Sequence, residues 1–187
     1  MIDRTAILKL WQGAKIRSDV SQAIARTAAY IEHYKDLYDP IEKALGIPWY
    51  VVGALDSREE NFNHHGYLGN GDPLYQRTTH VPRGRGPFST WSDGAIDALT
   101  MNGFNRLPEG GHWDIVTAPI KCEGYNGLGY SHMGLPSPYV WAGTNQQVAG
   151  KYVNDGEFDP HAWDNQPGCA ALFLSLKESF NVDLREA

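Results

Sequence analysis

The chain is poor in the features that mark several protein classes. Its 187 residues include only two cysteines, Cys122 and Cys169, which are too few for a disulfide scaffold and lack the close spacing of a zinc or redox motif. We expect both to be buried free thiols. Basic residues are also few, with 16 Lys and Arg against 22 Asp and Glu. The resulting net charge of −6 argues against a nucleic-acid partner held through its phosphates.

Long apolar runs are missing as well. No stretch approaches the roughly 18 apolar residues that a membrane-spanning helix needs. The N-terminal residues Met1-Ile2-Asp3-Arg4 carry charges where the apolar segment of a signal peptide would begin. We therefore expect no signal peptide, no membrane insertion and a chain that folds in the cytoplasm as a monomer. Since 42% of the residues are hydrophobic, we expect one domain over residues 1–187.

Helical and irregular stretches divide the chain. Apolar residues recur at helical spacing over 6–38, where Asp39-Pro40 is predicted to end the helix, and over 41–45, where Gly46 ends it. Further helices are predicted over 49–61, 91–102, 113–123 and 167–180, with one more near 145–152. Between 61 and 87, Gly and Pro break any helix around a β-capable stretch at 74–81, which indicates a small hairpin or ribbon. The expected fold class is α+β and mostly helical, with residues 1–45 packed on the rest.

One glutamate in the 49–61 helix is a candidate acid. Val52, Leu55, Glu59 and Phe62 share one helical face, so Glu59 is predicted to lie on an apolar stripe. Glu60 falls about 100° away and is predicted to be solvated. Because an apolar environment disfavours the charged form, the pKa of Glu59 should be raised, as a general acid near neutral pH requires.

A second carboxylate follows in the Gly-rich stretch. Asp72, in the turn Gly69-Asn70-Gly71-Asp72-Pro73, has no apolar neighbours and should stay ionised, and Thr78 lies six residues further on. One protonated and one ionised carboxyl group are what glycosidic bond cleavage needs, the first to protonate the leaving oxygen and the second to direct water. A threonine hydroxyl can help to hold that water.

At this point the residues resemble a known family, the lysozyme superfamily, and within it a group of bacterial and phage lysozyme-like proteins. The resemblance covers roughly residues 46–160. The motifs that carry it are Glu59-x-x-Phe62-Asn63, Asn70-Gly71-Asp72-Pro73-Leu74, Arg77-Thr78, Val81-Pro82-x-Gly84-Arg85, Tyr125-Asn126-Gly127-x-Gly129-Tyr130, Ser137-Pro138-Tyr139-x-Trp141 and Gly150-Lys151-Tyr152-Val153.

The resemblance implies a lysozyme-like fold, with a β lobe beside the catalytic helix, and a muramidase. Such an enzyme hydrolyses the β-1,4 bond between N-acetylmuramic acid and N-acetylglucosamine in peptidoglycan and needs no cofactor and no metal. Carried over residue by residue, Glu59, Asp72 and Thr78 would be catalytic, and Tyr125 and Asn126 would contact the glycan. We add Tyr139 and Trp141 as expected substrate contacts, since sugars stack on flat rings, together with Arg77 and His80. A muramidase without a signal peptide fits a bacteriophage endolysin.

Other readings of the sequence stay open. Seven histidines could supply a three-ligand zinc site, which would indicate a peptidoglycan amidase or peptidase, although none has the H-E-x-x-H spacing. A lytic transglycosylase would use the acid without a partner that directs water. Where the group has E-S-S this chain has Glu59-Glu60-Asn61, a difference that allows a non-catalytic glycan-binding module of a phage particle.

Overall fold

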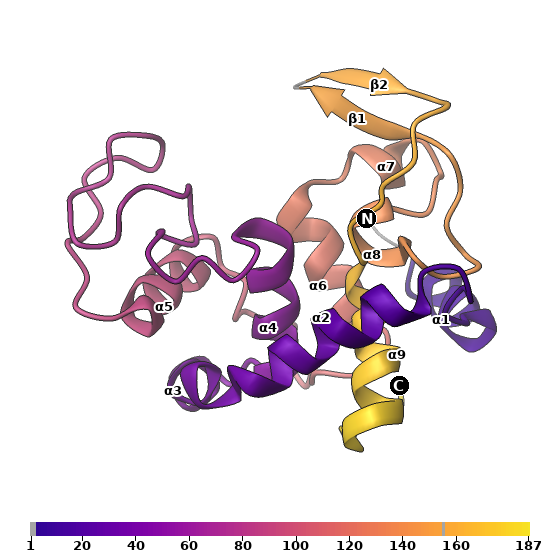
Figure 1. Ribbon diagram of the computed structural model, residues 1–187, viewed down its shortest axis with the longest axis horizontal. Coiled ribbons are helices and arrows are strands. Elements are labelled where there is room, and N and C mark those ends of the chain that lie inside the picture. The colour runs from indigo at the N-terminus through magenta and orange to yellow at the C-terminus, as the bar shows by residue number, and fades with distance from the viewer. Residues whose placement is uncertain (1–2, 155) are drawn as a thin grey trace. The chain divides into compact units, whose positions relative to one another are not determined.

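The computed structural model describes residues 3–154 and 156–187, and this part of the chain is mostly helical (Figure 1). It divides into two units, unit 1 with Met1–Tyr30 and Trp113–Ala187, and unit 2 with Ile31–His112. The helices are α1 (Arg4–Gly13), α2 (Ser21–His33), α3 (Lys35–Leu45), α4 (Trp49–Glu59), α5 (Trp91–Met101), α6 (Thr117–Asn126), α7 (Gly129–His132), α8 (Pro138–Trp141) and α9 (Cys169–Phe180), and the strands are β1 (Lys151–Asn154) and β2 (Glu157–Asp159).

The region predicted as one helix over 6–38 is broken between α1 and α2, so that prediction is wrong. The interrupting residues are held by the loop that follows α8. The backbone N–H of Arg17 donates to the carbonyl of Gly143 at 2.9 Å, and Ile16 forms an isolated antiparallel bridge with Thr144. These contacts between distant segments use backbone groups that a helix would have kept for itself.

Asp39-Pro40 was expected to end a helix, but Pro40 lies inside α3. A proline there removes one helical hydrogen bond and costs about 3 kcal/mol. Tyr38 and Ile41, on either side of it, are both fully buried, and burial of side chains of this size contributes about 1.5–3 kcal/mol each. The helix therefore continues to Leu45, where Gly46 ends it in a left-handed conformation (φ 67°), as predicted.

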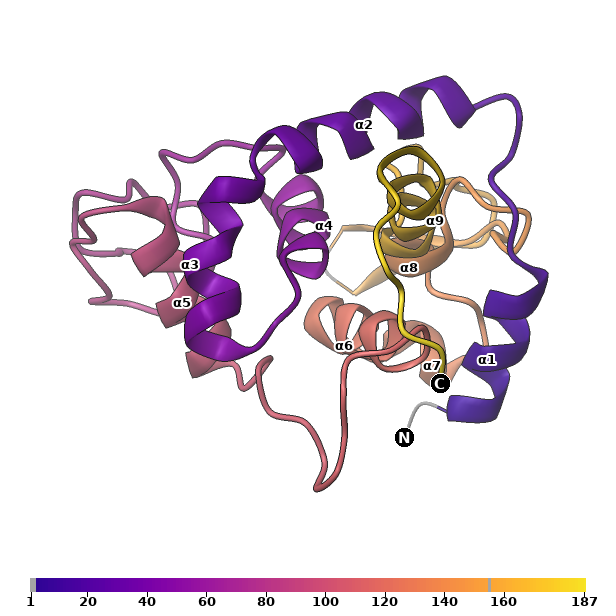
Figure 2. The ribbon, with the colours of Figure 1, turned by 90° about the horizontal axis from the view of Figure 1, so that it is seen from below.

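In unit 2, α3 packs against both α4 and α5 (Figure 2). Residues 50–57 of α4 are all buried, which explains why its apolar residues surround the helix instead of forming one stripe. Helix α5 begins as predicted, with a capping box in which the Thr90 hydroxyl accepts from the Asp93 N–H and the Asp93 carboxylate accepts from the Thr90 N–H.

The segment between α4 and α5 is not the predicted hairpin or ribbon, and its one β feature is an isolated bridge between Gly66 and Pro73. The stretch 74–81 is not a strand. Two backbone N–H groups that a strand would use, those of Thr79 and His80, donate instead to the carboxylate of Asp72. The segment is an irregular loop because a side chain satisfies its backbone where a neighbouring strand would otherwise do so.

This loop is anchored on α5. Tyr67 stacks on Phe88 with ring centroids 5.2 Å apart, and its hydroxyl donates to Asp97 at 2.8 Å. The guanidinium of Arg85 also pairs with Asp97, through both Nε and Nη2. An added Cβ at Gly94 of α5 would lie 2.9 Å from the buried Leu74, so a glycine is needed for this close approach.

Unit 1 gathers α1, α6, α8 and α9. Helix α9 confirms the predicted apolar helix, and Gly168 before it approaches α8 so closely that an added Cβ would lie 2.5 Å from the Val140 carbonyl oxygen. Helix α6 begins at Thr117, later than predicted, because the Asp114 carboxylate accepts the N–H groups of Val116 and Thr117. Cys122 and Cys169 are buried free thiols, as expected.

The small sheet lies elsewhere than predicted. Strands β1 and β2 pair antiparallel, with Lys151 opposite Asp159, in a region where a helix near 145–152 was expected (Figure 1). Tyr152 of β1 contacts the ring of Tyr130 in α7 and that of Phe158 in β2 edge to face, and the cross-strand contact with Phe158 favours an extended chain. The coarse α+β class is thus confirmed. Within the described ranges, no helix is long and apolar enough to span a bilayer.

Gly53 of α4 is packed so closely that a larger residue is predicted to destabilise the protein. A Cβ at this position would lie 2.3 Å from Ile31 Cγ2 and 2.9 Å from Tyr38 Cε2. Gly53→Ala should therefore destabilise the protein by about 1–3 kcal/mol, measured by urea denaturation. Gly124→Ala in α6 is the matched control, because no atom lies within 4 Å of its added methyl group and alanine is the better helix former. An unchanged midpoint for Gly53→Ala would contradict this packing.

Candidate functional site

The end of α4 carries two adjacent carboxyl groups whose environments are the reverse of those predicted. Glu59, the last helical residue, is exposed, whereas Glu60 is half-buried. The prediction is wrong because Asn61 and Phe62 turn into left-handed backbone conformations (φ 47° and 62°), so Phe62 does not extend the helical stripe beside Glu59. The catalytic role expected of Glu59 stays a prediction.

Glu60 lies against the glycines of the loop. An added Cβ at Gly66 would be 2.5 Å from its Oε2, and one at Gly71 would be 3.8 Å from its Oε1. The carboxyl group therefore occupies space that a side chain at position 66 would need, and it would be in ordinary van der Waals contact with one at position 71, the residue that precedes Asp72. This contact brings Glu60 close to the turn that holds Asp72.

The environment of Glu60 favours its protonated form. Burial raises its pKa from 4.5 to about 7, and the negative charges of Asp56 and Glu59 act in the same direction, while His64 opposes them. Because repulsion between two carboxylates is mutual, Glu59 and Glu60 resist being ionised together. The end of α4 can thus hold a proton near neutral pH.

A buried hydrogen-bond network lies beside this pair, and the sequence did not predict it. Asp56 is fully buried, its Oδ2 lies 2.7 Å from Nε2 of His64, and the same oxygen accepts from the Tyr38 hydroxyl at 2.8 Å. The His64 ring contacts Tyr34 and Trp91 edge to face. The sequence signal for this network was the four-residue spacing of Asp56 and Glu60, which places both on one face of the helix. We had predicted that face to be exposed to solvent.

Asp72 is ionised, as predicted, but it is not a free carboxylate. It is 6% exposed, and its Oδ2 accepts the backbone N–H groups of Thr79 at 2.6 Å and His80 at 2.9 Å. Its Oδ1 lies 2.6 Å from Nδ1 of His80. The hydrogen bonds from His80, backbone and ring, lower its pKa to about 2, with the N–H of Thr79 adding to them. Both oxygens are therefore occupied in holding the loop.

Neighbouring predicted residues also serve the loop. The buried Thr78 hydroxyl donates to the carbonyl of Pro82 and accepts from the N–H of Arg85, so no contact supports its predicted role with water. Arg77 is exposed and donates to the carbonyl of Gly84 at 2.9 Å. The His80 side chain is 77% exposed apart from its bond to Asp72, which leaves most of its ring accessible.

The other predicted glycan contacts belong to unit 1, whereas the carboxyl groups described above belong to unit 2. Tyr125 is half-buried and Asn126 exposed at the end of α6. Tyr139 is 4% exposed and Trp141 fully buried, so neither offers a ring face on the surface, and the expectation of open stacking platforms is wrong for both. They pack the core because α8 lies against α6 and α9.

The histidines were also possible metal ligands. Among the residues that the structure describes, no three His, Cys, Asp or Glu side chains are grouped as a metal ion would require. Comparisons of the chain with protein-family models, with curated proteins and with solved structures find no match.

The hydrogen bonds that Asp72 accepts from Thr79 and His80 predict that the stability of the fold depends on pH. The pKa of Asp72 is about 2 in the folded protein against an ordinary value of 3.8, so its ionised form stabilises the fold above pH 3.8, and this contribution is lost as the pH falls toward 2. The difference in melting temperature between wild type and Asp72→Asn should accordingly shrink over that interval. Asp39→Asn, at an exposed position of α3, is the control and should give a constant difference.

The raised pKa of Glu60 predicts the opposite change of stability with pH. The folded protein keeps its proton up to about pH 7, whereas an unfolded chain releases it near 4.5. The unfolded state therefore binds fewer protons in this interval, and stability decreases as the pH rises. Between pH 4.5 and 7, the melting temperature of Glu60→Gln should rise increasingly above that of wild type. The control Glu109→Gln, at an exposed position of unit 2, should follow wild type. Parallel curves for all three proteins would refute the raised pKa.

Proposed function

We propose that this protein cleaves the β-1,4 bond between N-acetylmuramic acid and N-acetylglucosamine in peptidoglycan by general acid catalysis, as a muramidase of phage endolysin type. The observation that carries the proposal is the pair of carboxyl groups at the end of α4, one exposed and the other with a pKa of about 7. Protonation of a glycosidic oxygen needs a carboxyl group that is still protonated near neutral pH. The resemblance of residues 46–160 to lysozyme-like proteins supports the same chemistry.

Glu59 is the proton donor in this proposal. It holds the position that the resemblance marks as catalytic, and its exposure makes it accessible to a polymer chain. Near neutral pH the proton of the pair resides on the half-buried Glu60, and in this proposal it passes to the adjacent Glu59, which donates it to the glycosidic oxygen. Cleavage of the C–O bond leaves positive charge on the sugar ring. In a hydrolase, water then bonds to that carbon and its proton returns to the Glu59 carboxylate.

Asp72 is a positioning residue in this scheme. Its carboxylate keeps the loop in the form in which Gly66 lies against Glu60. The predicted role of Asp72 in directing water would have to use the remaining acceptor capacity of Oδ1, since Oδ2 already accepts two backbone N–H groups and Oδ1 is in contact with Nδ1 of His80.

This occupancy favours one second candidate, a lytic transglycosylase. Such an enzyme uses the acid without a carboxylate that directs water, and the sugar's own 6-hydroxyl closes a 1,6-anhydro ring. Mass spectrometry of soluble products made in ¹⁸O-labelled water separates the two reactions. A hydrolase gives a labelled reducing end, and a transglycosylase gives an unlabelled product lighter by one water. Free amino groups released by the protein, lost on chelation, would instead indicate the zinc amidase or peptidase.

Clearing of purified peptidoglycan by matched variants tests the roles of the two glutamates. Glu59→Gln keeps the shape and removes the proton, so the rate should fall by about 10²-fold or more. Glu60→Gln should retain activity at low pH, with the alkaline limb of its pH profile moved to lower pH because the carboxyl group that holds a proton up to about pH 7 is gone.

Glu109→Gln serves as the control here too and should match wild type in rate and profile. Full activity in Glu59→Gln would exclude this residue as the acid, and loss confined to Glu60→Gln would transfer the role to its neighbour. A wild-type protein that binds peptidoglycan without cleaving it would support the non-catalytic glycan-binding module.

A further inference from the structure

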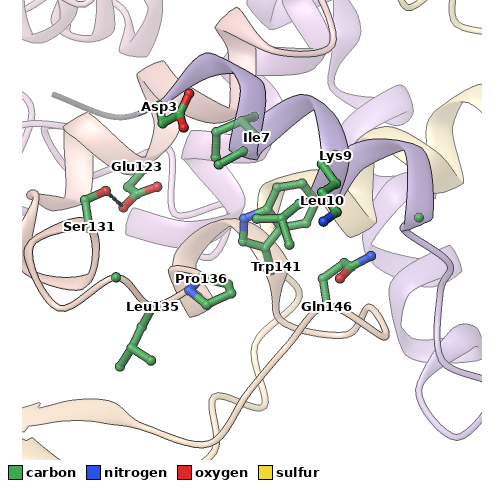
Figure 3. A pocket seen from close by; sticks show the side chains of 13 residues that line it. Asp3, Ile7, Lys9, Leu10, Glu123, Ser131, Leu135, Pro136, Trp141 and Gln146 are labelled. Atoms are coloured by element: carbon green, nitrogen blue, oxygen red, sulfur yellow. Dashed lines mark hydrogen bonds between the residues drawn. The ribbon is translucent and has the colours of Figure 1, made fainter.

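A pocket of about 670 Å³ lies within unit 1, between α1 and the residues from α6 to the loop after α8 (Figure 3). Its walls are mostly apolar, with Ile7, Leu10, Leu135 and Pro136 among the lining side chains. None of the carboxyl groups assigned to cleavage takes part in it. A cavity of this volume accommodates a ligand of the size of a mono- or disaccharide.

One polar wall of the pocket is a buried carboxyl group. Glu123 of α6 is 2% exposed, and the hydroxyl of Ser131 donates to its Oε1. Burial raises the pKa of Glu123, against hydrogen bonds from Ser131 that lower it. A carboxyl group held in an apolar cavity is costly unless it gains hydrogen-bonding partners, so a ligand N–H or O–H group at this wall would be stabilised.

The indole N–H of Trp141 is the second polar feature. Trp141 is fully buried, and its Nε1 has no hydrogen-bond partner among the described residues. Figure 3 shows the ring among the side chains that line the pocket, with its nitrogen on the side toward Glu123 and Ile7. A buried donor left without an acceptor costs about 1–3 kcal/mol, and a ligand carbonyl oxygen would remove that cost.

We propose that this pocket binds a small molecule through an N-acetyl group. An acetamido group offers a carbonyl oxygen to the Trp141 N–H, an N–H group to Glu123, and a methyl group to the apolar wall, all within a few atoms. Both amino sugars and acylated amino acids carry this group. The preference for the amino sugar rests on the proposed function, whereas recognition of the acetamido group rests on the pocket alone.

The test follows the Trp141 indole N–H signal by NMR, with ligand added to the full-length Glu59→Gln variant so that no turnover intervenes. N-Acetylglucosamine should shift this signal downfield and saturably, with a Kd of about 1 mM, as expected for a small ligand with few contacts. Glucosamine, which lacks the acetyl group, should bind at least about tenfold more weakly. An N-acetylated alanine amide distinguishes the two sources, since a tighter Kd than that of the sugar would assign the pocket to acylated amino acids.

Two matched substitutions locate the binding. Leu10→Trp fills the pocket and should weaken binding at least about tenfold, whereas Leu128→Trp, at an exposed position outside it, should leave Kd unchanged. No saturable shift up to about 20 mM ligand, or equal shifts with glucosamine and N-acetylglucosamine, would overturn the proposal. If the protein binds the ligand but cleaves no glycan, the pocket proposal stands and the proposed function is rejected. If it cleaves glycan but binds no ligand in the pocket, the proposed function stands and the pocket proposal is rejected.

Discussion

The carboxylate of Asp72 is the interaction on which the candidate site depends. By accepting the N–H groups of Thr79 and His80, it satisfies backbone that would otherwise need a paired strand, and so allows an irregular loop rich in Gly and Pro to hold one form. The loop brings Gly66 against Glu60, which is half-buried. The proton held at the end of α4 is thus a consequence of the packing of a loop that follows it in sequence.

Two carboxyl groups close to the same turn are held in opposite protonation states by different physical causes. Hydrogen bonds keep Asp72 ionised, with a pKa of about 2, because every donor in its contacts stabilises the charged form. Burial and two neighbouring negative charges keep Glu60 protonated up to a pKa of about 7. Contrast between neighbouring acids is a common basis of glycoside cleavage, and here it is built from local contacts within unit 2.

Much of the fold was accessible from the sequence because its signals are local. The capping box at Thr90, the left-handed Gly46, the apolar α9 and the two free cysteines follow from neighbouring residues or from composition. Predictions failed where partners come from far along the chain. The break after α1 depends on Gly143 and Thr144, and the missing strand at 74–81 depends on a side chain that takes its N–H groups.

Local sequence signals and contacts between distant residues also determined different properties of the site. The sequence by itself placed acidic residues at the end of a helix and in a glycine-rich turn and predicted that Asp72 is ionised, but the cause of its ionisation, hydrogen bonds from Thr79 and His80, came only from the tertiary structure. Only the tertiary structure decided that Glu60 is the half-buried acid and Glu59 the exposed one, that Asp56 holds His64, and that Trp141 is buried beside a pocket. Exposure and pKa are set by atoms that residues far apart in sequence bring together, and helical periodicity ends where the backbone turns, at Asn61 and Phe62.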